Sequence, residues 1–205
     1  MKYIFVVGAP GSKWSSVCKN IYYSPSIDRS DYDELCTYTH KASGSDKLMH
    51  LGAYFDPGMQ YGDFFDRIEQ YSKLACETEF DRPFSGTGIR IIKSHVLSNS
   101  IPFLRANWPD CPVVLIHRPN DACLGWWVRC GHFNITYPNY APYYKDLATM
   151  ATIIDQQNDG IRGFLDQAWT ANSNEHLAEI LRIECPPAKY KQVYADFDIK
   201  VKVLR

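Results

Sequence analysis

Three short segments of this sequence carry residue types that bind anions and move protons. The first runs from Gly8 to Ser16 and contains two glycines, three serines and Lys13. Glycines let the backbone turn tightly and approach a ligand closely, and the helix expected after them would direct its free N–H groups at an anion. A plain strand-to-helix turn with a Ser cap is the alternative, but ordinary turns rarely collect so many such residues. The segment predicts a cradle for an anion such as a phosphate group.

The second and third segments add imidazoles and further cations. Lys93, Ser94 and His95 follow one apolar run, and His117 and Arg118 follow another. An imidazole can exchange a proton near neutral pH, and a guanidinium pairs well with phosphate oxygens. Each segment alone is also compatible with a solvated turn at a strand end. Their joint occurrence is the stronger indication of a site.

The elements that must position these segments alternate between strand and helix. Residues 3–8, 88–95 and 112–117 are apolar runs typical of buried strands. Helical patterns are expected at residues 14–22, 64–74, 103–108 and 120–129, and a long one in the C-terminal third, broken near Gly160. This order predicts an α/β fold of three layers, a parallel sheet flanked by helices. Ligands bind beyond the carboxyl ends of such strands, so the three segments should meet in one cleft.

The first segment can be compared with two families of phosphate-binding loops. Its Gly-Ala-Pro-Gly-Ser-Lys spelling resembles adenylate-kinase-like enzymes, but the Gly that precedes the Walker Lys is missing. The shorter loop resembles the 5′-phosphosulfate loop of sulfotransferases, which it matches at Pro10, Ser12 and Ser15. Gly11 stands where that family usually keeps a catalytic Lys or Arg, and Lys13 stands where it keeps a Gly. On this resemblance Lys13 is expected to take over the catalytic charge.

The other two segments resemble sulfotransferase motifs in the same order. Lys93-Ser94-His95 is similar to the family's Lys-Thr-His, which implies that His95 is the general base and that Lys93 contacts the transferring group. Such a base is worth roughly 100- to 10,000-fold in rate. The third segment resembles the 3′-phosphate segment, which makes both His117 and Arg118 candidate ligands; guanidinium chemistry favours Arg118. The Ser that the family places four residues after Asp121 is Gly125 here.

The resemblance implies a P-loop NTPase-like sulfotransferase fold in a single domain over residues 1–205. It implies 3′-phosphoadenosine-5′-phosphosulfate as donor, 3′-phosphoadenosine-5′-phosphate as product, and no metal. The catalytic residues would be Lys13, Lys93 and His95. The nucleotide would be bound by Gly11, Ser12, Lys13, Trp14, Ser15, Ser16, His117 and Arg118. No counterpart of the family's closing loop stands in residues 189–205.

The acceptor side is expected in residues 47–58, where sulfotransferases place acceptor contacts. His50, Tyr54 and Asp56 mix aromatic and polar character and are the candidate acceptor ligands. Single His and Asp residues in loops also serve as turn-formers, which is the alternative. The acceptor would be a small molecule or saccharide with a hydroxyl or amine.

Composition limits the partners. The 22 basic and 23 acidic side chains give a net charge of -1, so no global field attracts nucleic acid or an anionic membrane. No apolar stretch approaches the roughly 20 residues of a membrane span, and the seven cysteines show no metal-ligand spacing. A cytoplasmic protein with reduced thiols is expected. Two alternatives stay open: a P-loop kinase of nucleotides or small molecules, and a nucleotide-binding module without transfer activity.

Overall fold

A five-stranded sheet forms the centre of the computed structural model, which describes residues 1–34, 38–39, 48–131, 145–187, 194, 196 and 198–205. The strand order is β4-β1-β5-β7-β6. The strands are β1 (Tyr3–Gly8), β4 (Arg90–Lys93), β5 (Val113–His117), β6 (Trp169–Ala171) and β7 (Lys200–Leu204). A separate antiparallel ribbon pairs β2 (Tyr38–Thr39) with β3 (Leu48–His50).

The sheet is mixed, which corrects the expectation of a parallel one. β1 pairs in parallel with β4 on one side and with β5 on the other. β7 then runs antiparallel to both β5 and β6. The three strands expected from the sequence are therefore the parallel part, and the C-terminal third contributes the strand that reverses direction. Every residue of β1 is buried, as befits a central strand covered on both faces.

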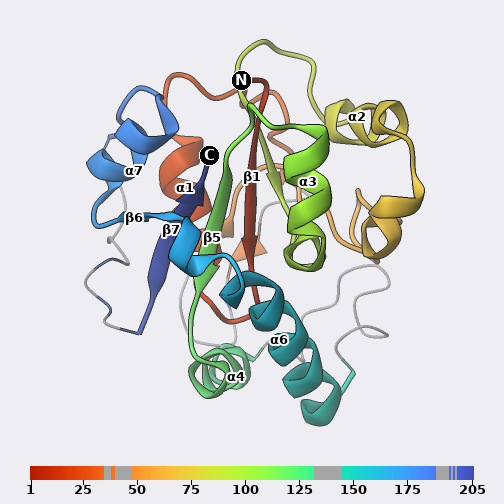
Figure 1. Ribbon diagram of the computed structural model, residues 1–205, viewed down its shortest axis with the longest axis vertical. Helices are drawn as coiled ribbons and strands as arrows, with labels where there is room; N and C mark the ends of the chain where they lie inside the picture. The colour runs from red at the N-terminus through yellow and green to blue at the C-terminus, as the bar shows by residue number, and fades with distance from the viewer. Residues whose placement is uncertain (35–37, 40–47, 132–144, 188–193, 195, 197) are drawn as a thin grey trace.

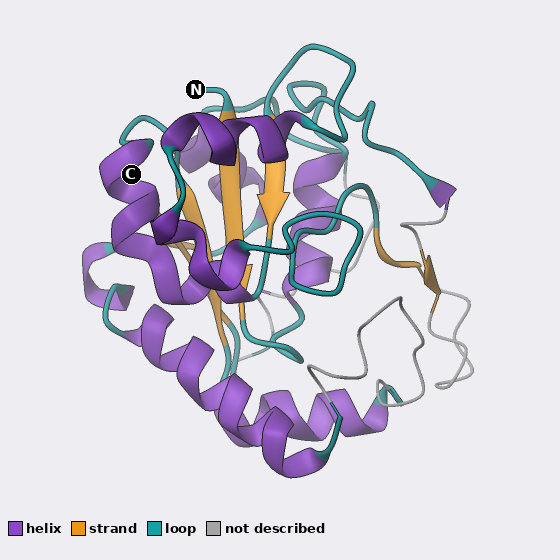
Figure 2. Cartoon of the chain, turned by 90° about the vertical axis from the view of Figure 1, so that its right-hand side faces the viewer, coloured by secondary structure: helices purple, strands orange, loops and turns teal. Residues whose placement is uncertain are grey.

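Helices cover both faces of the sheet, so the expected three layers are present (Figures 1 and 2). One face packs its alternate side chains against α1 (Trp14–Tyr22) and α7 (Asn174–Leu181). The other face packs against α2 (Lys73–Asp81) and α3 (Ile101–Asn107). Short 3-10 helices lie at η2 (Phe65–Gln70), η3 (Val96–Ser100) and η5 (Leu165–Gln167).

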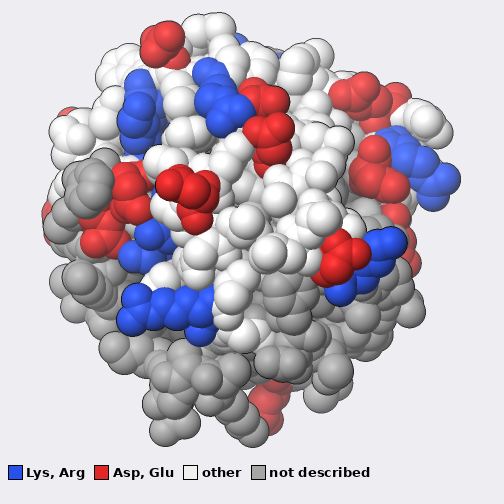
Figure 3. Space-filling model, turned by 90° about the horizontal axis from the view of Figure 1, so that it is seen from below, with Lys and Arg blue, Asp and Glu red and all other residues white. Residues whose placement is uncertain are grey.

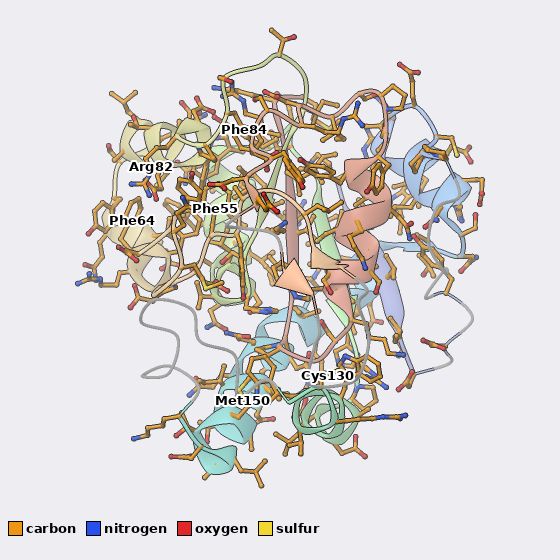
Figure 4. All side chains as sticks on the ribbon, turned by 180° about the vertical axis from the view of Figure 1, so that it is seen from behind. Phe55, Phe64, Arg82, Phe84, Cys130 and Met150 are labelled. Atoms are coloured by element: carbon orange, nitrogen blue, oxygen red, sulfur yellow. The ribbon has the colours of Figure 1, made fainter. Side chains whose placement is uncertain are left out.

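Two helices lie below the carboxyl ends of β1 and β5 in Figure 1: α4 (Asn120–Arg129) and α6 (Leu147–Arg162). Cys130 at the end of α4 and Met150 on α6 are both buried and lie near each other in Figure 4. As expected, α6 ends near Gly160: it continues through this residue and stops at Arg162. A Cβ at Gly160 would lie 2.3 Å from the carbonyl oxygen of Ser98, so the glycine allows the helix to pack closely against η3.

The helix expected at residues 64–74 is wrong in type and place. A 3-10 helix occupies residues 65–70, and the chain is extended at Tyr71, with φ -106° and ψ 149°. The α-helix starts one residue after Ser72, whose hydroxyl accepts a hydrogen bond from the Ala75 amide as an N-cap. Phe64 and Phe55, visible in Figure 4, belong to the aromatic packing around this segment. The cap, and not the earlier aromatic spacing, sets the start of α2.

Within the described part of the chain, no helix has the length and apolarity needed to cross a membrane. Every cysteine that the structure describes is a free thiol.

Candidate functional site

The three polar segments meet at the carboxyl ends of β1, β4 and β5. The imidazole of His95, which follows β4, contacts the carbonyl oxygen of Gly8 at the end of β1 through its Nδ1 atom. From the other side, Nη1 of Arg118, which follows β5, donates to the carbonyl oxygen of Gly11 at 3.2 Å. The loop after β1 is thus held between the ends of its two neighbouring strands.

The loop itself turns through two left-handed residues. Gly11 has φ +82°, and a Cβ there would lie 2.1 Å from the carbonyl oxygen of Cys123 in α4. Lys13, the residue before α1, has φ 63° and ψ 20°. A side chain at Gly11 would collide with the α4 backbone, so the basic residue that sulfotransferases keep at this position has no room here. The loop contributes its charge two residues later, from Lys13.

Ser12 is completely buried in the loop, and its hydroxyl has no hydrogen-bond partner among the described residues. An unsatisfied buried hydroxyl costs about 1–3 kcal/mol. The two other loop serines lie at the start of α1: Ser15 is buried and Ser16 is half-buried. The loop therefore holds polar groups beyond those that its own fold uses.

Lys13 lies at the rim of the loop, between a carboxylate and an aromatic ring. Its Nζ atom is 2.8 Å from Oδ2 of Asp196 and 4.8 Å from the ring centroid of Trp126. Trp126 is half-buried on α4, and its neighbour Trp127 is buried in the core. Trp126 is therefore the part of the tryptophan pair that forms a wall of the site.

Of the two residues expected at the 3′-phosphate, only Arg118 lies at the loop. Its Nε atom donates to Oδ2 of Asp198 at 2.7 Å, in addition to the bond to Gly11. His117 continues the side of β5 that carries Val113 and Leu115, which packs against α2 and α3. His117 therefore lies on the face of the sheet opposite to the one that α1 covers.

His117 has its own distinctive environment. Both ring nitrogens are buried without a hydrogen-bond partner in the described structure. Burial, with a smaller contribution from the positive charges of Arg162 and Lys200, lowers the pKa of His117 from 6.5 to about 4. The ring is therefore a neutral, packed side chain at neutral pH.

His95 is held in the protonation state that a general base requires. A carbonyl oxygen only accepts hydrogen bonds, so Nδ1 must donate its proton to Gly8, which leaves Nε2 as the acceptor nitrogen of the neutral ring. Burial lowers the pKa of His95 and outweighs the opposing effects of the Asp56 charge and the Gly8 carbonyl. The ring packs against Trp14, at 4.2 Å between centroids, and edge-on against Tyr54, at 5.7 Å.

Asp56 supports this arrangement instead of facing an acceptor. Its buried carboxylate accepts hydrogen bonds from the Ser94 hydroxyl at 2.7 Å, the His95 amide at 3.2 Å and the Val96 amide at 3.1 Å. These bonds fix the turn that joins β4 to η3, in which His95 lies. Asp56, expected as an acceptor ligand, therefore has both of its carboxylate oxygens hydrogen-bonded to the chain itself.

Lys93, expected to contact the transferring group, is buried and hydrogen-bonded to the chain. It is 3% exposed, and its ammonium donates to the carbonyl oxygens of Leu51 and, at 3.3 Å, Gly52. Its charge lies near the buried Asp31 carboxylate, whose pKa is raised by burial in spite of the Lys93 charge. Lys93 thus anchors the segment that leads into Tyr54.

Of the residues expected to bind the acceptor, Tyr54 is the one whose ring contacts His95. It is buried and contacts Trp14 as well, at 5.4 Å between ring centroids. His50 ends β3, but its side chain lies outside the described residues. The aromatic rings of Trp14 and Tyr54 form the wall beside the imidazole.

Asp196 and Asp198 were not anticipated from the sequence. They precede β7 in a stretch without a recognisable motif, and only the return of the chain along β5 brings them to the loop. Seen from below in Figure 3, this end of the molecule shows positive and negative side chains next to one another. No group of three His, Cys, Asp or Glu side chains in the described residues is arranged to hold a metal ion.

Comparisons with protein-family models, with curated proteins and with solved structures found no match. The argument for function therefore depends on the geometry of the site.

The packing of Gly11 against α4 can be tested with a pair of glycine variants. Gly11→Ala should lower the free energy of unfolding by about 2 kcal/mol, because the methyl group meets the Cys123 carbonyl and φ is positive. Gly125→Ala, within α4, meets nothing within 4 Å and should raise it by about 1 kcal/mol through helix propensity. Urea unfolding measures both values. Equal effects would contradict the close approach of the loop to α4.

The neutral state of His117 predicts how stability depends on pH. Between pH 6.5 and about 4 the unfolded chain binds a proton at this residue that the folded chain does not, so the free energy of unfolding falls as pH drops through this window. His117→Gln should show a smaller fall than the wild type in urea unfolding at pH 7, 5.5 and 4. An identical pH dependence would mean that the pKa of His117 is the same in the folded and unfolded chains.

Proposed function

We propose that this chain is a sulfotransferase that moves a sulfuryl group from 3′-phosphoadenosine-5′-phosphosulfate to a hydroxyl or amine acceptor, and that its fold is of the P-loop sulfotransferase type. The observation that carries the proposal is the environment of His95. Burial lowers the pKa of the ring and so favours its neutral form. Nδ1 donates a hydrogen bond to the Gly8 carbonyl oxygen in the loop after β1, which leaves Nε2 as the nitrogen that can accept a proton. The contact with Gly8 supports a role for His95 as the general base beside the loop that would bind the donor.

The loop suits the phosphosulfate end of the donor. Its polar groups are the Lys13 ammonium, the start of α1 and the buried Ser12 hydroxyl, which has no hydrogen-bond partner in the described part of the chain. A helix N-terminus and a lysine both stabilise negative charge that develops on a leaving phosphate. Arg118, on the other side of Gly11, is the cation available to a second phosphate such as the 3′-phosphate.

The reaction follows from these positions. The acceptor oxygen or nitrogen forms a bond to sulfur while its proton passes to Nε2 of His95. The bond between sulfur and the bridging phosphate oxygen breaks, and the electron pair stays on that oxygen in the product 3′-phosphoadenosine-5′-phosphate. Positioning and charge stabilisation dominate such transfers, as they do in phosphoryl transfer. The bonds from Asp56 to residues 94–96 and from Gly8 to the ring supply the positioning of His95.

We expect the acceptor to be a small molecule or saccharide lying against Trp14 and Tyr54. Both rings contact the His95 imidazole. Aromatic side chains suit the apolar faces of sugars and ring compounds. The free thiols of the described cysteines fit the cytoplasmic setting that we propose.

A second candidate is a nucleotide-binding module without transfer activity. It is favoured by the state of two positions, Gly11 and Lys93, at which sulfotransferases usually use a basic side chain in catalysis. Gly11 has no room for a side chain, and the Lys93 ammonium is bound to the carbonyls of Leu51 and Gly52. Such a module would bind the nucleotide at Lys13 and Arg118 and would not need His95.

The ligand can be tested by thermal unfolding with 3′-phosphoadenosine-5′-phosphate and, separately, with ATP and Mg²⁺. At about 100 times its dissociation constant, a ligand of the folded state adds about 2.7 kcal/mol of stability. We expect the 3′-phosphorylated nucleotide to stabilise the protein. Stabilisation by ATP with Mg²⁺, but not by the 3′-phosphorylated nucleotide, would contradict the proposed sulfotransferase and indicate a kinase.

The base can be tested with His95→Asn. The Asn amide can still donate to the Gly8 carbonyl but has no basic nitrogen, so turnover should fall about 100-fold or more while nucleotide affinity is retained. Sulfate transfer from the donor to a panel of phenols, amines and sugars measures turnover, and His176→Asn, on α7, is the matched control. If the chain is a nucleotide-binding module without transfer activity, the wild type should show no turnover. Unchanged turnover in His95→Asn would show that His95 is not the general base.

A further inference from the structure

The two cations of the candidate site are each paired with a carboxylate from the same stretch of chain. Nζ of Lys13 lies 2.8 Å from Asp196, and Nε of Arg118 lies 2.7 Å from Asp198. The cations come from different segments, one after β1 and one after β5, and we call them the basic pair. The carboxylates are two residues apart and precede β7, so a single short segment neutralises both members.

The basic pair forms one site with an aromatic wall. The ring centroid of Trp126 lies 4.8 Å from the Lys13 ammonium and 5.9 Å from the Arg118 guanidinium. The Gly11 carbonyl also accepts from Arg118. Both cations lie within about 6 Å of the centre of the same ring, so we expect an anion that reaches either cation to compete with its carboxylate.

Both ion pairs are partly buried. The side chains of Lys13 and Asp196 are 20% and 27% exposed, and those of Arg118 and Asp198 are 11% and 19% exposed. Partly buried charges are screened less by salt than charges on the open surface. An anion that binds at the basic pair is therefore attracted by Lys13 and Arg118 and repelled by the nearby carboxylates of Asp196 and Asp198.

We propose that Asp196 and Asp198 are built-in counter-ions that occupy the anion positions of the basic pair and determine which ligand charge the site accepts. The inference depends on the proposed binding of a phosphate-bearing nucleotide at the loop. A singly charged anion gains little by exchanging with a carboxylate of equal charge. A ligand with two phosphate or sulfate groups can replace both carboxylates at once, so the pair of aspartates selects ligands with two such groups over anions with one.

The inference can be tested by replacing each carboxylate with its amide. Asp196→Asn and Asp198→Asn keep an oxygen that accepts from the cation but remove the negative charge that opposes a ligand. Each should tighten the binding of 3′-phosphoadenosine-5′-phosphate and of pyrophosphate about ten-fold, and the double variant by more. The double variant should also bind inorganic sulfate, a dianion with a single sulfate group, with an affinity closer to that for pyrophosphate.

Isothermal titration calorimetry at one fixed salt concentration measures these affinities. Asp166→Asn is the charge-matched control: Asp166 lies in η5, just before β6, and β6 runs parallel to β5, so it is at the amino end of the strands. This control should leave the affinities unchanged. Circular dichroism of each variant verifies that it is folded, and the two single variants keep the test valid if the double variant does not fold.

The outcomes separate the inference from the proposed function. Unchanged or weaker anion binding in Asp196→Asn and Asp198→Asn would show that the carboxylates hold the loop in shape and would overturn the inference, even if the nucleotide binds to the wild type. Tighter pyrophosphate binding that is lost in Lys13→Ala, with no binding of the nucleotide to any variant, would support the inference and overturn the proposed donor. Absence of anion binding in every variant would overturn both.

Discussion

The parallel pairing of β1 with β4 and β5 is the constraint on which the site depends. It brings the ends of three strands that are far apart in the sequence to one edge of the sheet. The loop after β1 is then held by His95 on one side and by Arg118 on the other. Without this pairing the three polar segments would be separate turns.

The charged residues of the site differ in how deeply they are buried, and this difference relates to their roles. The Asp56 carboxylate and the Lys93 ammonium are both nearly inaccessible and satisfy amides, a hydroxyl and carbonyls of the chain. An unpaired buried charge is costly, so such groups are committed to the fold. The less buried cations Lys13 and Arg118 are paired with Asp196 and Asp198, the carboxylates that we propose a ligand replaces. Burial therefore separates residues that build the site from residues that can serve it.

Much of the architecture followed from local patterns. The apolar runs marked β1, β4 and β5, and the residues after Lys13 formed α1 at the expected bounds. The expected helix at residues 64–74 failed because the Ser72 cap, and not the aromatic spacing, determines where α2 starts. The reversal of β7 could not be expected from an alternating pattern of strands and helices, since direction in a sheet depends on which strands become neighbours.

The sequence by itself determined which residues carry charge and proton-transfer chemistry, because residue type and the ends of apolar runs are local properties. Only the tertiary structure decided what each of them does. The side of β5 on which a side chain falls placed Arg118 at the loop and His117 away from it. Contacts between distant segments tied Lys93 to residues 51–52, Asp56 to the His95 turn and Asp196 to Lys13. These partners are far apart in the chain, and their pairing depends on packing that no local pattern contains.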